Sequence, residues 1–275
     1  WDTIAFGQVP SKAHRLYKKA FLKHVPEEYT GYLSKVAEGK EKINTAGLQP
    51  HELVYSYMSL GMTERNETLE LQWQTMRGKI VGSLKNSLSV VDVSGSMAGE
   101  PMNVAIALGI LTSELNKGLF QDHVITFSQK PEWVELKGSL CEKVKKMREA
   151  PWGMNTNLEA VFEMILRMAK AFGCSQEQMP GTLFIFSDMQ FDQACKNNKP
   201  IYEEMKERFR EQGYMIPSIV FWNLRAVEKS FPVKQDENGT ALVSGFSGEL
   251  LNLFLEEKEI SPRLIYRKAI DRYTC

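Results

Sequence analysis

The pattern of hydrophobic and polar residues changes character near residue 86. Before that point the apolar spacing is helical. In residues 11–24 it predicts an apolar stripe along one helix face, with the basic residues on the other face. The members of this stripe are Ala13, Leu16, Tyr17, Ala20 and Phe21. Further helices are predicted at 26–43, 49–61 and 63–80, the last with Thr63 as its N-cap candidate.

From residue 86 onward, short apolar runs alternate with helical stretches. The runs predict strands at 87–93, 123–127, 132–136, 182–187, 218–223 and 242–245. Helices are predicted between and after them at 101–117, 140–148, 158–171, 200–212 and 248–256. This alternation is typical of βαβ units, in which helices cover both faces of a largely parallel sheet. The segment 124–136 has the pattern of a hairpin, which places one antiparallel strand at an edge.

These elements predict an α/β fold in which a doubly wound, mainly parallel six-stranded sheet follows an α-helical segment. We expect residues 1–86 to form the helical segment and residues 87–257 to form the α/β domain. Residues 258–275 are expected to form a C-terminal helical extension, because Ser261 and Pro262 suit the N-cap and first position of a helix.

The first predicted strand ends in a conspicuous polar sequence. Its apolar run is interrupted by Asp92, and Ser94 and Ser96 follow on either side of Gly95. In a doubly wound sheet, ligands bind beyond the carboxyl ends of the strands. Side chains two residues apart in extended backbone project to the same side, so a carboxylate and two hydroxyls are presented together. Hard oxygen donors of this kind are the ligands that Mg²⁺ prefers.

Two further oxygen donors are expected at the same edge. Asp188 follows the buried strand 182–187, and Thr156 lies in a loop directly before a predicted helix. A plainer interpretation of DVSGSM is a strand-to-helix turn with a capping serine. Because the oxygen donors Thr156 and Asp188 are expected at the same edge of the sheet, a metal site is favoured over this plainer interpretation. Its five predicted ligands are Asp92, Ser94, Ser96, Thr156 and Asp188.

These five residues resemble a metal-ion-dependent adhesion site, and residues 86–256 resemble a von Willebrand factor A domain. The resemblance narrows to the TROVE group, the Ro autoantigen family and its relatives in plants and other eukaryotes, through DVSGSM, VITFS, WGMNT, LFIFSDMQFDQA, IVFWNLR and ALVSGFS. In Ro relatives, a helical repeat ring that binds small structured RNAs precedes this domain. VPSKAHRLYKKAFLKH and LQPHELV resemble the end of that ring, which implies that residues 1–86 end a larger helical region.

The resemblance also implies a role for each site residue. The two serines would bind the ion through their hydroxyls, the two aspartates directly or through waters, and Thr156 in one of two loop arrangements. Many family members carry an acid after the loop threonine, where this chain has Asn157, and this change lowers the negative charge at the site. The expected cofactor is Mg²⁺, with Mn²⁺ or Ca²⁺ as alternatives.

The donor set and the resemblance together predict a non-enzymatic interaction module. An ion held largely by neutral hydroxyls keeps a position that a carboxylate or phosphate of a partner can fill. The expected partner is a protein that offers a carboxylate, or a ribonucleoprotein, and no small-molecule substrate is expected. One alternative is a phosphohydrolase of the haloacid dehalogenase kind with Asp92 as nucleophile, although Ser94 stands where its second acid is required. Another is a structural subunit of a large assembly with a vestigial metal site.

The helix at 11–24 offers a second candidate contact, with structured RNA. Between residues 12 and 23 it carries five basic residues and no acid: Lys12, Arg15, Lys18, Lys19 and Lys23. Such a row can follow a phosphate backbone in a salt-dependent way. A basic run of this length is more often a solvated helix face. The resemblance to Ro relatives keeps RNA among the expected partners.

Composition and charge narrow the picture further. The 275 residues are 43% hydrophobic and 25% charged with zero net charge, so attraction to nucleic acid would need a local patch. The four cysteines and four histidines lack the spacing of a disulfide framework or zinc site, which favours an intracellular protein, cytoplasmic or organellar. No apolar run approaches the ~20 residues that span a bilayer, so no membrane partner is expected. A start at Trp1 rather than methionine suggests a fragment or processed product.

Overall fold

A computed structural model describes residues 1, 3–59, 64–127, 130–151, 157–189, 201–225, 239–246, 251 and 254–255. Thr63, Thr156, most of the predicted helix 248–256 and the extension 258–275 lie outside these residues. The helices are η1 (Phe6–Gln8), α1 (Ser11–His24), α2 (Pro26–Ala37), α3 (Pro50–Ser59), α4 (Glu67–Gly78), η2 (Gly95–Met97), α5 (Glu100–Leu115), α6 (Leu140–Glu149), α7 (Leu158–Phe172), η3 (Gln176–Gln178) and α8 (Ile201–Glu211). The strands are β1 (Leu84–Lys85), β2 (Ser87–Asp92), β3 (Asn116–Lys117), β4 (His123–Phe127), β5 (Glu132–Glu135), β6 (Thr182–Ser187), β7 (Ser218–Asn223) and β8 (Thr240–Ser244).

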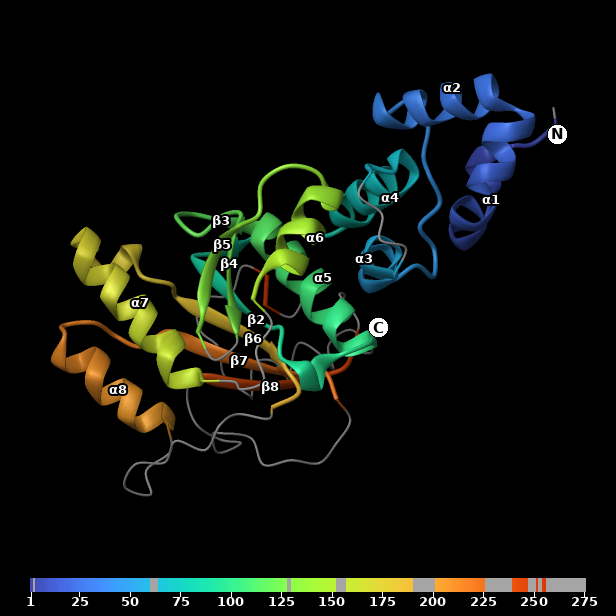
Figure 1. Ribbon diagram of the computed structural model, residues 1–275. Coiled ribbons are helices and arrows are strands. Elements are labelled where there is room, and N and C mark those ends of the chain that lie inside the picture. Colours follow the sequence, from blue (N-terminus) through green and yellow to red (C-terminus); the bar gives the residue numbers. More distant parts are fainter. Residues whose placement is uncertain are drawn as a thin grey trace, which may run out of the picture.

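Six strands form the central sheet in the order β5-β4-β2-β6-β7-β8 (Figure 1). All neighbours are parallel except β4 and β5, which form the antiparallel pair expected at an edge. The doubly wound, mainly parallel six-stranded sheet is therefore confirmed. The chain runs outward from β2 to β5 and then returns to β6 on the other side of β2. This reversal makes the carboxyl ends of β2 and β6 the place where such sheets bind ligands.

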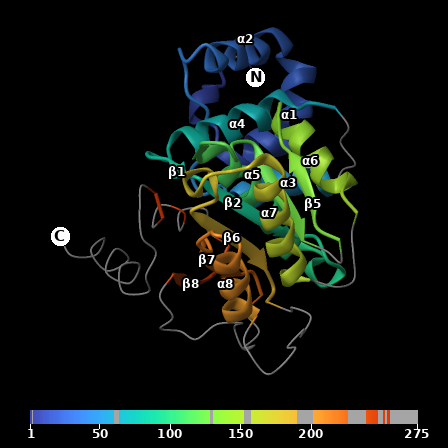
Figure 2. The ribbon, with the colours of Figure 1, turned by 90° about the vertical axis from the view of Figure 1, so that its left-hand side faces the viewer.

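Alternate residues of the strands pack into two separate layers. Val91 of β2 and Phe186 of β6 belong to the cluster that contains α5, whereas Val90 and Ile185 belong to the cluster that contains α7 and α8. This separation follows from the two-residue period of a strand, because successive side chains point to opposite faces. Figure 2 shows α7 and α8 together on one side of the sheet. Each strand of the centre is thus buried on both faces, as its continuous apolar run predicts.

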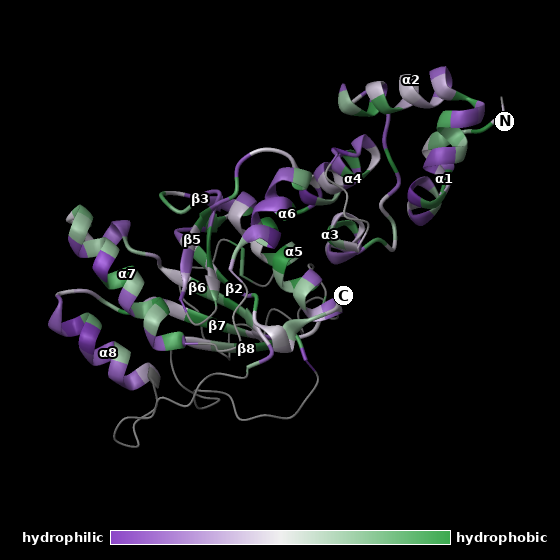
Figure 3. Cartoon of the chain, viewed as in Figure 1, coloured by the Kyte–Doolittle hydropathy of each residue, from purple (hydrophilic) through white to green (hydrophobic). Residues whose placement is uncertain are grey.

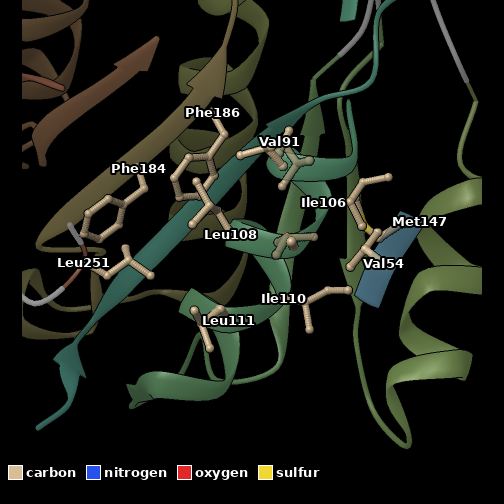
Figure 4. Packing of buried hydrophobic residues seen from close by; sticks show 14 of the residues in the cluster. Val54, Val91, Ile106, Leu108, Ile110, Leu111, Met147, Phe184, Phe186 and Leu251 are labelled. Carbon is tan, nitrogen blue, oxygen red and sulfur yellow. The ribbon is translucent and has the colours of Figure 1, made fainter. Parts of the chain in front are cut away.

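Helix α5 is the most buried helix of the described chain. Of its 16 residues, 13 are buried, and it is apolar on every side, as its colour in Figure 3 shows. One side packs on β2 and β6, and the other is covered by α3 and α6. Figure 4 shows Val54 of α3 and Met147 of α6 beside Ile106 and Ile110, opposite the sheet residues. A helix that is largely hydrophobic all round needs cover all round, and α3 of the N-terminal segment shares the outer side of α5 with α6.

Polar contacts fix this segment to the α/β domain. The buried Glu70 of α4 accepts hydrogen bonds from the backbone N–H groups of Leu140 (2.8 Å) and Cys141 (3.0 Å), at the start of α6. The carboxylate thus meets the positive end of the α6 dipole and two N–H groups that have no partner within the helix. Glu114 of α5 accepts from the Trp73 indole and is paired with Lys143 at 2.6 Å.

The prediction of which face of α1 is buried is wrong for Leu16 and Tyr17 but holds for Phe21. Leu16 and Tyr17 of the predicted stripe are 72% and 56% exposed, whereas Phe21 and the polar His14 are buried. The inner face is instead held by polar contacts. His14 donates from Nε2 to the carbonyl of Phe6 (3.0 Å), and Arg15 donates to the carbonyl of Glu52 in α3 (2.9 Å). These long-range acceptors cannot be recognised from helical periodicity.

Two other sequence boundaries also differ. The helix expected at 26–43 ends at Ala37, because Gly39 takes a left-handed backbone conformation (φ 74°) that breaks the helical path. The helix expected from Thr63 begins at Glu67. Within the described residues, none of the helices combines the length and apolar character required to cross a membrane.

Candidate metal centre

The carboxylate of Asp92 is fixed at the end of β2. It is fully buried, and its Oδ1 accepts a hydrogen bond from the backbone N–H of Ser94 (2.9 Å). Its Oδ2 accepts a hydrogen bond (2.5 Å) from the hydroxyl of Ser187, which is the last residue of the neighbouring strand β6. The Ser94 contact is local to the turn after β2, whereas the Ser187 contact exists because β2 and β6 are adjacent and parallel, so their carboxyl ends coincide. The Asp92 side chain therefore has little freedom to turn away from the strand end.

The two serines bring their hydroxyl oxygens together directly beyond this carboxylate. The short helix η2 turns the chain after Ser94, and the Oγ atoms of Ser94 and Ser96 lie 3.0 Å apart. Ser94 is buried, and Ser96 is partly exposed. Adjacent corners of an octahedron with arms of 2.0–2.1 Å are about 3.0 Å apart, so the observed spacing suits two ligands of one Mg²⁺ ion.

Asp188 supplies the second acid of the site. It follows β6 directly, and its side chain is 0% exposed. Residues 187–189 make a tight bend at this point, in which Met189 has φ 61° and donates its N–H to Ser187 Oγ (3.1 Å). The guanidinium Nη1 of Arg225 lies 4.0 Å from Asp188 Oδ2. Asp92 and Asp188 are thus two buried acids at neighbouring strand ends with one nearby cationic side chain.

The electrostatics of the pair favour a cation. The pKa of Asp92 is raised to about 6, mainly by burial and also by the negative charge of Asp188, against the hydrogen bonds from Ser187 and Ser94, which lower it. A divalent ion would relieve both causes. Within the described residues, no group of three or more His, Cys, Asp and Glu side chains could hold a metal. The candidate site instead combines two carboxylates with hydroxyls, which are hard oxygen donors that fit Mg²⁺.

Thr156, the fifth predicted ligand, lies outside the described residues. The neighbouring Asn157 has a structural role as the N-cap of α7. Its side-chain oxygen accepts a hydrogen bond from the backbone N–H of Ala160 (3.0 Å). An asparagine in place of an acid at this position still satisfies a helix N–H group, since both residue types cap well.

The basic residues of α1 divide into two groups. Three of them contact α3 or the residue before α4: Lys12 pairs with Glu52 at 2.9 Å, Arg15 donates to backbone and hydroxyl oxygens of α3, and Lys18 donates to Asn66 Oδ1 at 2.7 Å. Burial lowers the pKa of Lys18. Lys19 and Lys23 are exposed. The row of five cations is therefore not presented as one continuous face.

Two contributors to the site went unnoticed in the sequence pattern. Ser187 holds Asp92, yet a serine at the end of an apolar strand carries no signal of that role. Arg225 approaches Asp188 because β7 lies beside β6, a neighbour relation that the local sequence does not give. Trp222 of β7 is fully buried, and its indole donates to the carbonyl of Gly245 (2.8 Å), so it packs in the core.

A doubly wound sheet with acids and hydroxyls at the ends of its two central strands defines a von Willebrand A-like α/β fold. Residues 86–269 match the family model described as domain of unknown function (DUF7788), and the chain belongs to that family. Residues 1–86 match a second model, domain of unknown function (DUF2828).

The chain is also similar to a curated protein and to solved structures. The chain is 40% identical over 291 residues to an uncharacterized protein of Acanthamoeba polyphaga mimivirus, a match that covers 99% of this chain and 50% of that protein. It therefore spans about half the length of the curated relative it matches. The Ro (RSR) protein of Deinococcus radiodurans is similar in structure, with a TM-score of 0.53 at 16% identity over 83% of this chain and 47% of that chain. The SpRpn10 VWA domain matches with a TM-score of 0.33 at 12% identity, over 62% and 92% of the two chains.

Proposed function

We propose that the chain is a non-enzymatic interaction module that docks an acidic group of a protein or ribonucleoprotein partner through a divalent cation. The cation is held at the carboxyl ends of β2 and β6. The observation that carries this proposal is that two buried acids, Asp92 and Asp188, lie at the ends of neighbouring parallel strands, and that a pair of serine hydroxyls 3.0 Å apart follows Asp92. The guanidinium of the half-exposed Arg225 lies 4.0 Å from Asp188 Oδ2, so a cationic group already approaches this pair of acids.

Each residue has a distinct part in this scheme. Ser94 and Ser96 bind the ion through their hydroxyls, and the two aspartates hold it directly or through waters. Ser187 positions Asp92, and Thr156 is the proposed fifth ligand. When bound, Mg²⁺ supplies a position at which a carboxylate or phosphate oxygen of a partner can bind. Ser96 lies at the more exposed side of the group, so we expect that position to face solvent there.

The geometry argues against the phosphohydrolase alternative. The general acid of such an enzyme would stand at Ser94, whose hydroxyl instead contacts Ser96. A serine hydroxyl of ordinary acidity is a poor proton shuttle at neutral pH.

The first test is cation binding by the chain alone. Isothermal titration with Mg²⁺ and Mn²⁺ is expected to give a single site in the wild type and none in Asp92→Asn or Ser96→Ala, with unchanged far-UV circular dichroism. Ser59→Ala is the matched control, because Ser59 is an exposed serine of α3 that bonds only its own helix. A wild type that binds neither ion at millimolar concentration, or an Asp92→Asn variant that binds as well as the wild type, would overturn the metal site.

The second test concerns the partner. Capture from extract with and without EDTA, analysed for protein and RNA, is expected to enrich partners only when the cation is present. Loss of the same partners from the Ser96→Ala variant would tie the capture to this site. Partners retained equally in EDTA would contradict cation-dependent docking.

A further inference from the structure

Arg225 is built into the edge of the candidate site by two backbone contacts. The N–H of Leu224 donates to the carbonyl of Ser187 (2.9 Å), which extends the pairing of β7 with β6 by one residue. The N–H of Arg225 donates to the side-chain oxygen of Asn223 (2.8 Å), which closes a tight turn after the strand. The Cα of Arg225 is therefore fixed relative to Ser187 and hence to Asp188.

The side chain of Arg225 spans from the buried acid to solvent. Its Nη1 lies 4.0 Å from Asp188 Oδ2, while 41% of the side chain is exposed, against 0% for Asp188. This distance is at the long end for an ion pair, so the contact is loose and the guanidinium can turn outward without losing a well-formed bidentate bond. A guanidinium carries five N–H donors in a planar fork that matches a carboxylate or a phosphate.

Arginine and a divalent cation are alternative partners for the same carboxylate. Both draw on the negative charge of Asp188, and a cation bound there repels the guanidinium. A unit charge 4 Å from a binding site in water changes the affinity of that site for a charged ligand by about fivefold, and by more where water is excluded. The direction of this effect is unambiguous: Arg225 beside Asp188 weakens cation binding when no anionic ligand is present.

We propose that Arg225 couples the cation to the anionic ligand. Without the cation, Arg225 pairs with Asp188. When the cation binds, Arg225 is released toward solvent and takes one oxygen of the partner's carboxylate while the cation takes the other. This inference rests on the proposed metal site and specifies how its ligand is recognised. Coupling of this kind is reciprocal, so the carboxylate tightens cation binding by the same factor as the cation tightens carboxylate binding.

The test compares wild type, Arg225→Gln and Arg225→Lys, with Arg167→Gln, an exposed arginine of α7, as the control. Titration with Mg²⁺ alone is expected to show about fivefold tighter binding in Arg225→Gln than in the wild type. Acetate, titrated at saturating Mg²⁺ and followed by NMR, is expected to bind at least threefold more weakly to Arg225→Gln. Arg225→Lys keeps the charge but loses the planar fork, so its Mg²⁺ affinity should match the wild type while acetate binding weakens.

The outcomes separate this inference from the function on which it rests. If the wild type and Asp92→Asn both fail to bind Mg²⁺, the metal site itself is refuted and the coupling with it. If the wild type binds Mg²⁺ and Asp92→Asn does not, yet Arg225→Gln equals the wild type for Mg²⁺ and acetate, only the coupling is refuted. In the wild type, the Arg225 Nε–H signal is expected to shift when Mg²⁺ is added and again with acetate. A signal that responds to neither would also overturn the coupling.

Discussion

Gly109 is the point at which α5 lies closest to the sheet, and replacing it with alanine tests the packing beneath the candidate site. A Cβ at Gly109 would fall far inside van der Waals contact with Cγ2 of Val91. Val91 is fully buried in β2, directly before Asp92, and its β-branched side chain has few rotamers to move into. The strand or the helix would have to shift to make room.

Two opposing effects decide the outcome of Gly109→Ala. Alanine is favoured over glycine inside a helix by about 1 kcal/mol. Overpacking of a dense core costs about 1–3 kcal/mol. Because the new Cβ would overlap Cγ2 of Val91, we expect the upper part of this cost, about 2–3 kcal/mol, and hence a net loss of about 1–2 kcal/mol in the free energy of unfolding, measured by urea denaturation. The matched control is Gly31→Ala in α2, where a Cβ would meet nothing within 4 Å. That substitution should not destabilise the protein, because only the helix preference changes.

A double-mutant cycle isolates the contact. With Val91→Ala in place, the new Cβ at position 109 would lie 3.8 Å from Cβ of residue 91 and 3.9 Å from Cγ1 of Val124, both ordinary contacts. Gly109→Ala should then become neutral or stabilising, with a coupling energy of about 2 kcal/mol between the two sites. Two outcomes would refute this close approach of helix and strand. One is a Gly109→Ala protein that retains Val91 and is as stable as the wild type. The other is a double mutant in which the effects of the two substitutions simply add.

Two further predictions concern the N-terminal segment. Glu70→Gln should lower the free energy of unfolding by about 2–3 kcal/mol in urea denaturation, because an amide cannot accept from Leu140, Cys141 and the Tyr57 hydroxyl together. A loss under 0.5 kcal/mol would contradict the buried cap. Burial lowers the pKa of His14 below the 6.5 of the unfolded chain, so its contribution to stability is complete above pH 6.5 and decreases as pH falls below it. Once the pH dependence of intrinsic exchange is divided out, the protection of α1 amides against hydrogen exchange should therefore decrease from neutral pH to pH 5.5 more in the wild type than in His14→Phe. An equal decrease in both proteins would exclude this cause.

The elements of the sheet could be predicted because strand burial on both faces leaves an unambiguous pattern. Strands β4, β6 and β7 have the predicted bounds, since a continuous apolar run bounded by polar residues has one interpretation in an α/β chain. The position of Asp92 and Asp188 could be predicted for the same reason. Each ends a buried strand, and parallel strands end at one edge of the sheet.

The inner face of α1 could not be predicted, because it is decided by partners distant in sequence. His14 finds the carbonyl of Phe6 and stacks on Tyr32 with ring centroids 5.7 Å apart, in an aromatic cluster that includes Phe21 and Tyr29. The stacked rings supply the apolar contact that Leu16 and Tyr17 were expected to make. Hydrophobic spacing shows which side chains of α1 prefer burial. The surface that α2, α3 and α4 offer determines which face of α1 is actually buried.

The two matched families meet at residue 86 in the sequence, but residues from both sides of this boundary pack in one hydrophobic cluster. Leu53 and Trp73, from before the boundary, share one cluster with Ile110 of α5 and with Trp222 of β7. Helix α5 begins only four residues after Ser96, so its position on the sheet fixes where the serine loop lies relative to Asp188. Because α3 covers the outer side of α5, and Glu70 caps α6 beside it, the helical segment contributes to the geometry of a site that contains none of its own residues. We therefore expect the geometry of the candidate site to depend on the helical segment that precedes the α/β domain in the chain.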